Sequence, residues 1–153
     1  MPRVARSRVI AARREAVWKL ISDPHNLPRW WPRAARVEDV RGTGARMRWT
    51  TVLETERGVP VRADYRCAAS EEPSRFEWRQ EVDGTPFERI LKSSALEIRL
   101  ERAPQGATDV RMTAEETLRG FARLGALMLR GAAARRLDEA LAGIELALVG
   151  EPR

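Results

Sequence analysis

Apolar and polar side chains alternate through the middle of this chain, and this alternation constrains the fold more than any other feature. In three successive segments between residues 46 and 82, one face carries mostly apolar or aromatic side chains and the other mostly charged ones. The first face holds Met47, Trp49, Thr51 and Leu53, then Val61, Ala63, Tyr65 and Cys67, then Phe76, Trp78, Gln80 and Val82. A period of two predicts strands with one buried and one solvated face. Turn-forming residues separate the segments, so we expect antiparallel hairpins.

Four further strands are predicted at residues 3–10, 35–40, 88–101 and 109–118, the first of them at an edge of the sheet. From about residue 120 the period changes, and apolar or small side chains recur every three or four residues. This stripe consists of Leu124, Leu127, Gly131, Ala134, Leu137, Leu141, Ile144 and Leu148. It predicts a helix about 43 Å long, ending near residue 148. Because a one-sided sheet must cover its apolar face, we expect the sheet to curl around this helix.

The segment AVWKLISDPHNLPRWWP, residues 16–32, predicts two short helices separated by a forced stop. Its first half has apolar residues at helical spacing, and Asp23 before Pro24 ends that helix. The second short helix carries two tryptophans and ends at Pro32. The segment resembles the opening of the START-like SRPBCC superfamily, to which the birch-pollen allergen belongs, and particularly its polyketide cyclase/dehydrase and lipid-transport branch. The resemblance implies an α+β helix-grip fold. In this fold a curved antiparallel sheet of about seven strands wraps around a long C-terminal helix, and two short helices follow the first strand.

Length and composition favour a single domain over residues 1–153. No repeat or linker divides the chain, and no stretch approaches the roughly 20 apolar residues of a membrane span. The N-terminus also lacks the apolar region of a signal peptide, so we expect a cytoplasmic protein. Cys67 is the only cysteine and His25 the only histidine, which leaves no spacing for a disulfide or a metal site. We therefore expect no cofactor, and the oligomeric state stays open, a homodimer included.

A net charge of +6 raises the question of nucleic-acid binding. All but two of the 28 basic residues are arginine, and acidic residues are interleaved with them, as in Arg75, Glu77, Arg79 and Glu81. This pattern is typical of the solvated face of a strand, whereas a phosphate-binding surface would cluster its basic residues. We therefore expect a small hydrophobic ligand as the partner, and no nucleic acid.

If each hairpin closes without a change of register, the alternation also predicts neighbours on the inner face. The predicted pairs are Met47 with Cys67, Trp49 with Tyr65, Cys67 with Trp78, Trp78 with Lys92, and Ser94 with Glu116. Lys92 and Glu116 then lie on the apolar side, where an unpaired charge is costly. There they would anchor a ligand in a mostly apolar cavity. Alternatively, a bulge near Ser93 and Ser94 turns Lys92 outward, or both charges lie at the rim of the sheet.

The small residues of the C-terminal stripe admit two interpretations. Gly131 and Ala134 either leave space for a guest molecule or pack tightly against the bulky Trp49 and Trp78. Of the two tryptophans in the second short helix, we expect one in the core and one at the rim of the cavity. The predicted ligand-binding set is Trp31, Trp49, Tyr65, Trp78, Gln80, Lys92, Ser94, Glu116, Leu127, Met128 and Gly131.

These features predict binding of a small hydrophobic or amphipathic ligand, such as a lipid, polyketide or aromatic metabolite, between the sheet and the long helix. The family resemblance also allows an aromatase/cyclase- or dehydratase-type enzyme in the same cavity. In that case Glu116 or Lys92 would act as acid or base and Tyr65 as an oxyanion partner. A third interpretation is a regulatory or ribosome-associated protein that uses its arginines. The nucleophile elbow, the P-loop and the dinucleotide motif are all absent from the sequence.

Overall fold

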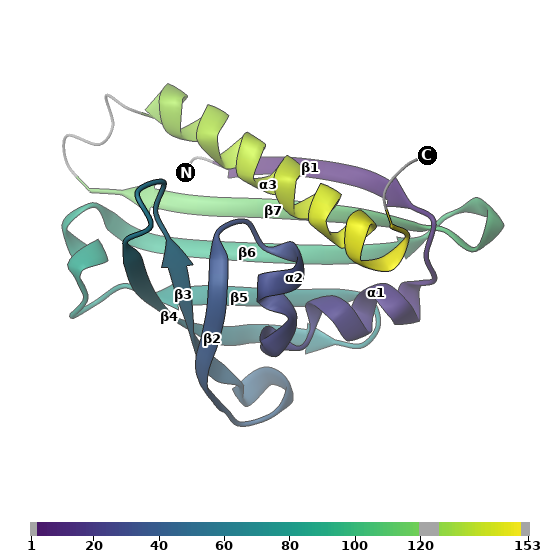
Figure 1. Ribbon diagram of the computed structural model, residues 1–153, viewed down its shortest axis with the longest axis horizontal. Coiled ribbons are helices and arrows are strands. Elements are labelled where there is room, and N and C mark those ends of the chain that lie inside the picture. Colours follow the sequence, from purple (N-terminus) through teal and green to yellow (C-terminus); the bar gives the residue numbers. More distant parts are fainter. Residues whose placement is uncertain (1–2, 120–125, 151–153) are drawn as a thin grey trace.

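The structure, a computed structural model, describes residues 3–119 and 126–150, in which seven strands form one sheet (Figure 1). The strands are β1 (Arg3–Ile10), β2 (Ala34–Arg41), β3 (Arg48–Glu54), β4 (Pro60–Glu71), β5 (Arg75–Glu81), β6 (Leu91–Arg102) and β7 (Thr108–Leu118). The helices are α1 (Arg14–Ile21), α2 (Leu27–Trp30) and α3 (Ala126–Leu148), and 3₁₀ turns lie at Pro24–Asn26, Gly44–Arg46, Pro86–Arg89 and Pro104–Gly106. Every predicted strand is thus confirmed. None of the helices in these two ranges is both long enough and apolar enough to cross a bilayer.

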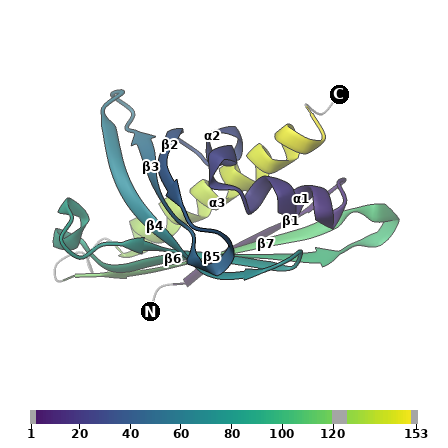
Figure 2. The same cartoon turned by 90° about the horizontal axis from the view of Figure 1, so that it is seen from below.

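The sheet is an antiparallel meander with the first strand of the chain at one edge. Its order is β1-β7-β6-β5-β4-β3-β2, so the strands from β2 to β7 are neighbours in sequence order and β1 pairs with β7. Figure 2 shows β2, β3 and β4 bending out of the plane of the other strands, toward the side on which the helices lie. The predicted α+β helix-grip architecture is confirmed.

Local sequence explains the break between α1 and α2. The apolar face of α1 is buried and consists of Val17, Trp18, Leu20 and Ile21. Asp23 follows in an extended conformation, and its carboxylate accepts a hydrogen bond of 3.0 Å from the backbone N–H of His25. The same carboxylate oxygen lies 2.9 Å from the His25 imidazole. His25 is therefore an exposed turn residue, and Asp23 both ends the first helix and begins the next turn.

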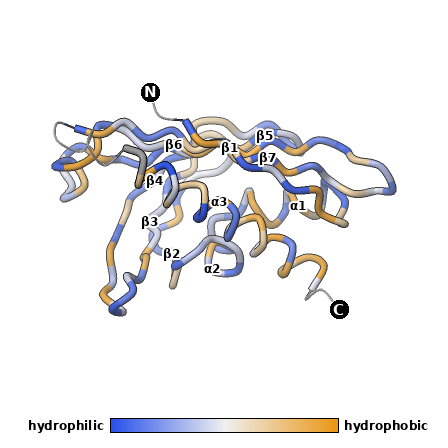
Figure 3. The backbone as a smooth tube through the Cα atoms, turned by 90° about the horizontal axis from the view of Figure 1, so that it is seen from above, coloured by the Kyte–Doolittle hydropathy of each residue, from blue (hydrophilic) through white to orange (hydrophobic). Residues whose placement is uncertain are grey.

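The C-terminal half of α3 packs against α1, α2 and β1 in a filled core. Its last turns are mainly hydrophobic, as Figure 3 shows. The buried side chains of α3 are Ala133, Leu137, Ala140, Leu141 and Ile144. Gly143 lets the backbones of α2 and α3 approach each other, because a Cβ at this position would lie 2.5 Å from the carbonyl oxygen of Trp30. A larger residue at this position would push the two helices apart.

The predicted apolar stripe of α3 is correct in its second half and wrong in its first. The prediction reached Gly131 by two steps of three residues, from Leu137 through Ala134, yet Gly131 is exposed and Met128 is 81% exposed. With 3.6 residues per turn, each three-residue step rotates the stripe by about 60° around the helix axis. The buried stripe continues instead through Ala133. Gly131 therefore lies on the solvent side, so neither interpretation of it as an inward-facing residue holds.

The pairing of β5 with β6 also differs from the prediction. Trp78 lies opposite Leu96 and not opposite Lys92. The reason is the 3₁₀ turn Pro86–Arg89, which lengthens the connection so that β6 begins only at Leu91. Because the shift of four residues is even, it leaves the inward face of β6 unchanged. The predicted pairs Trp49–Tyr65, Cys67–Trp78 and Ser94–Glu116 are confirmed.

A β-bulge in β6 decides the position of Lys92. The bulge lies between Leu91 and Ser93, which pair with consecutive residues of β7, so Lys92 is an extra residue in its strand. Its side chain is exposed and lines a hollow on the outer face of the sheet, together with Glu115. The placement of Lys92 on the inner face is therefore wrong, and the alternative with an outward-turned Lys92 is correct.

Candidate functional site

A cavity of about 280 Å³ lies between the sheet, the N-terminal half of α3 and the segment that follows α2. The apolar part of its lining includes Trp31, Pro32, Leu53, Trp78, Phe87 and Leu91. The polar part consists of Arg33, Tyr65, Gln80, Ser94, Glu116 and Arg136. Small-molecule sites typically start at about this volume and combine an apolar lining with a few polar groups.

Aromatic side chains form one wall of the cavity. Trp31 and Tyr65 both meet Trp78 edge to face, with ring centroids 5.3 and 6.0 Å apart. Trp49 stacks on Tyr65 at 5.9 Å and is only 2% exposed, so it supports the wall from behind and does not line the cavity. Trp30 is buried in the core, whereas Trp31 is partly exposed at the cavity. The expectation of one core and one rim tryptophan is thus confirmed.

A row of polar side chains crosses the floor of the cavity on four neighbouring strands. Tyr65 of β4 pairs with Gln80 of β5, and Ser94 of β6 pairs with Glu116 of β7. Gln80 and Ser94 each lie one residue beyond the last pair of the β5–β6 ladder, which joins residues 79 and 95. All four side chains line the cavity. The alternation that placed Gln80, Ser94 and Glu116 on the inner face therefore predicted this row.

Glu116 is paired with a residue from the opposite side of the cavity. Nη2 of Arg136, on α3, donates a hydrogen bond of 2.5 Å to Oε1 of Glu116. The two side chains are 39% and 24% exposed, so the pair is partly shielded from water. This contact provides the counter-charge that a carboxylate on an apolar face requires.

Two hydrogen-bond donors in the lining lack an acceptor within the part of the chain that the structure describes. They are Nε2 of Gln80 and Nε of Arg136, and both atoms are buried. Buried polar groups in folded proteins are nearly always hydrogen-bonded, to protein or to water. Both unpaired donors belong to residues that line the cavity.

Tyr65 adds a further donor, because its phenol stays protonated over the physiological range. Burial raises the pKa of Tyr65 to about 12, an effect that the positive charge of Arg136 opposes and the negative charges of Glu116 and Asp64 reinforce. A neutral phenol can donate a hydrogen bond to a ligand oxygen, but it is a poor general base.

The structure brings together six of the predicted ligand-binding residues: Trp31, Tyr65, Trp78, Gln80, Ser94 and Glu116. The others lie elsewhere. Trp49 is behind the wall, Lys92 is on the outer face, and both Met128 and Gly131 are exposed. The side chain of Leu127 lies outside the described part of the chain.

Sequence reasoning missed Arg136, Phe87 and Leu91 as lining residues. For Arg136 a signal was present, because it follows Ala133 by three residues and precedes Ala140 by four, and both alanines belong to the buried stripe. For Phe87 and Leu91 no comparable signal exists. Their positions depend on the 3₁₀ turn between β5 and β6, which the alternation does not predict.

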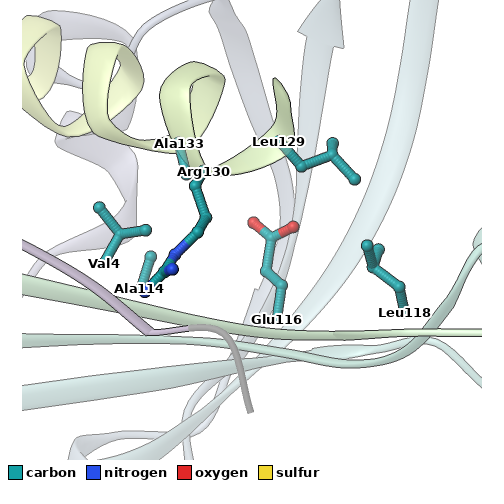
Figure 4. Close-up of a pocket in the computed structure, with 7 residues that line it drawn as sticks. All are labelled: Val4, Ala114, Glu116, Leu118, Leu129, Arg130 and Ala133. Carbon is teal, nitrogen blue, oxygen red and sulfur yellow. The ribbon is translucent and has the colours of Figure 1, made fainter. Parts of the chain in front are cut away.

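A smaller hollow of about 20 Å³ lies beside the cavity, beneath the first turns of α3. Its lining is Val4, Ala114, Glu116, Leu118, Leu129, Arg130 and Ala133. Figure 4 shows Glu116 reaching from β7 toward α3 among these residues. The hollow has room for about one water molecule. It shares Ala114 and Glu116 with the cavity, so Glu116 lies at the boundary between the two spaces.

A family model described as polyketide cyclase / dehydrase and lipid transport matches residues 1–148. The chain belongs to this family. The resemblance carried by residues 16–32 is thereby confirmed. A sequence search among curated proteins finds no match.

Solved structures share the fold of this polyketide cyclase/dehydrase and lipid-transport family member. Ara h 8.0201 has a TM-score of 0.78 at 18% identity, over 98% of this chain and 99% of that protein. A START superfamily protein from Mycobacterium smegmatis has a TM-score of 0.77 at 12% identity, over 95% and 96%. Zhui aromatase/cyclase from Streptomyces sp. R1128 has a TM-score of 0.75 at 16% identity, over 94% and 91%. Identities this low show a common fold and no more.

Proposed function

We propose that this protein binds a small hydrophobic or amphipathic molecule in the cavity between β4–β7 and the N-terminal half of α3. The observation that carries the proposal is the cavity itself, about 280 Å³ with an aromatic wall and a polar row across its floor. Family membership and the shared fold support the same class of role, hydrophobic-ligand binding or cyclisation.

The aromatic wall favours a ligand with a flat, ring-containing body. Trp31, Tyr65 and Trp78 present ring edges and faces to the same space. Aromatic contacts contribute about 0.5–1.5 kcal/mol beyond the burial of apolar area, so a ring system gains more from this wall than an alkyl chain of equal area. The polar row then orients the ligand by its oxygen atoms.

A pair of phenylalanine substitutions tests the cavity. Ala114 is 5% exposed on the cavity floor, whereas the preceding residue, Thr113, lines a hollow on the outer face of the sheet. Ala114→Phe fills part of the cavity, and Thr113→Phe adds the same bulk outside it. Titration with 2-acetylnaphthalene, followed by tryptophan fluorescence, should show at least tenfold weaker binding for Ala114→Phe and unchanged binding for Thr113→Phe. Native mass spectrometry of the purified protein should also detect a co-purifying hydrophobic molecule.

Thermal unfolding followed by circular dichroism shows whether each variant is folded under the conditions of the binding measurement. Overpacking a buried site costs about 1–3 kcal/mol, so Ala114→Phe should melt at a lower temperature yet remain folded at 25 °C. Equal binding by the wild type and both variants would contradict the proposed site. Absence of binding to the wild type would contradict the proposed function.

A second candidate function is a cyclase- or dehydratase-type reaction in the same cavity. It is favoured by the position of Glu116 and a protonated Tyr65 in one lining. Glu116 would remove a proton next to a substrate carbonyl, and the Tyr65 phenol would stabilise the oxygen that gains negative charge. Lys92 has no part in this scheme because it lies on the outer face. With a poly-β-ketone substrate, turnover that disappears in Glu116→Gln while binding persists would support catalysis; equal turnover would exclude this role.

A further inference from the structure

The charges in the cavity lining are arranged in pairs. Arg136 is hydrogen-bonded to Glu116 across the cavity, and Arg33 at the rim contacts Glu56 at 3.4 Å. Arg33, Glu116 and Arg136 are the only charged side chains of the described residues that line the cavity, and Arg130 lines only the smaller hollow. With Glu56 included, the charges around the cavity sum to zero. An anionic ligand therefore finds no excess positive charge to offset the loss of its hydration.

Unpaired hydrogen-bond donors nevertheless belong to residues that line the cavity. Nε2 of Gln80 and Nε of Arg136 have no acceptor in residues 3–119 and 126–150, and the protonated Tyr65 is a third donor. A buried donor without a partner is unfavourable, so a ligand oxygen that accepts from these groups adds hydrogen bonds that the described protein groups do not provide. A carbonyl oxygen has two lone pairs and loses far less hydration on entry than a carboxylate does.

We propose that Glu116 determines the charge of the ligand: by neutralising Arg136, it makes the cavity select a neutral molecule that presents a carbonyl oxygen to Gln80 and Arg136, and disfavour the corresponding carboxylate. A ligand carboxylate at this position shares one guanidinium with the carboxylate of Glu116, and the two like charges repel. This inference rests on the proposed function of the cavity and specifies the chemistry of its ligand.

Three matched two-ring compounds test the inference. 2-Acetylnaphthalene carries a ketone, 2-naphthoate carries a carboxylate at the same ring position, and 2-ethylnaphthalene has no polar group. Dissociation constants at pH 7 from tryptophan fluorescence should place the ketone at least tenfold tighter than 2-naphthoate. The ketone should also bind several-fold tighter than 2-ethylnaphthalene, because only the ketone satisfies the unpaired donors.

Two variants isolate the two parts of the proposal. Glu116→Gln keeps the shape of the side chain but frees the charge of Arg136, so affinity for 2-naphthoate should rise at least tenfold and the preference for the ketone should disappear. Its matched control is Glu115→Gln, on the same strand but paired with Arg3 at 3.2 Å on the outer face, which should leave all three affinities unchanged. Gln80→Leu should lower only the affinity for the ketone.

The outcomes separate this inference from the proposed function. If 2-ethylnaphthalene binds but the ketone and the carboxylate bind equally well, charge selection is wrong while the cavity is still a ligand site. If Glu116→Gln is folded by circular dichroism and gains no affinity for 2-naphthoate, the role of Glu116 is wrong. If that variant does not fold, the wild-type ranking and the Gln80→Leu result decide. Failure of all three compounds to bind overturns both proposals.

Discussion

The C-terminal half of α3 packs onto a solid core, whereas its N-terminal half borders a cavity. From Leu137 onward, the inward side chains Leu137, Ala140, Leu141 and Ile144 are at most 1% exposed. Toward the beginning of the helix, Met128 and Gly131 face solvent and Arg136 lines the cavity. One continuous helix therefore packs onto the core with its C-terminal half and lines the cavity with its N-terminal half. The two halves differ in what lies between the helix and the sheet.

The short helices α1 and α2 account for this difference. They lie beside α3 (Figure 2) and contact it. They also supply buried side chains to the shared core. Gly143 allows α2 to approach the backbone of α3 there. At the other end, the interior is bounded by the bent strands β3 and β4 and by the aromatic wall. Stability and binding are thus located in different parts of one interior, and substitutions should separate them.

The largest expected effect is a loss of stability in the C-terminal half of α3, the packed half. The N-terminal half, which borders the cavity, is the open half. Leu137→Ala removes a fully buried side chain and should lower the free energy of unfolding by about 2–5 kcal/mol. Leu129→Ala, its counterpart in the open half, removes a side chain that is 39% exposed and should cost about 1 kcal/mol or less. Urea unfolding followed by circular dichroism measures both. Equal losses would show that the two halves of α3 are packed alike.

The protonation of Tyr65 tests whether the open half is dry. Tyr65 is the only tyrosine, so its ionisation can be followed directly by absorbance, with an expected midpoint near pH 12 in the folded protein and near pH 10 in denaturant. Because the folded-state pKa is the higher one, the stabilisation is complete below pH 10 and is lost as the pH rises toward 12. This pH-dependent contribution of Tyr65 to the free energy of unfolding amounts to at most about 3 kcal/mol. Tyr65→Phe should lack this component, and a folded midpoint near pH 10 would show that water reaches the ring.

Sequence alone predicts most of this fold, because the period of two holds along most of β3, β4, β5 and β7. The inward positions of Trp78, Gln80, Ser94 and Glu116 followed from it, and an even shift of register left them inward. The exception is Lys92, since a single inserted residue reverses which face a side chain occupies. Bulges and 3₁₀ turns arise from how strands pack in three dimensions, and the alternation carries little information about them.

The rotation of a helix is harder to predict than the face of a strand. A stripe of small residues such as Gly131, Ala133 and Ala134 satisfies helical spacing at several rotations, so the pattern does not fix which residue faces inward. For this reason the pattern does not identify Arg136 as the partner of Glu116. Its identification required the position of α3 over β7, which the structure supplies.

Substitution of Gly143 should have an intermediate effect. The added Cβ of Gly143→Ala would lie 2.5 Å from the Trp30 carbonyl oxygen and 3.0 Å from the Trp30 Cα, so α2 and α3 must move apart. We expect a loss of about 1–3 kcal/mol in the free energy of unfolding, despite the higher helix propensity of alanine. Thermal and urea unfolding measure it. Unchanged stability would mean that α2 moves away from α3 at little cost.

The smallest expected effect has the opposite sign and lies in the open half of the same helix. Apart from its chain neighbours and the backbone of its own helix, no atom of the described residues lies within 4 Å of a Cβ built on Gly131, which is exposed. Gly131→Ala should therefore gain up to about 1 kcal/mol from helix propensity alone. Its affinity for 2-acetylnaphthalene should equal that of the wild type, because the position faces solvent. Weaker binding would instead place Gly131 at the cavity and extend the open half further around the helix. The contrast in sign between the same substitution at residues 131 and 143 measures directly how differently the two halves of α3 are packed.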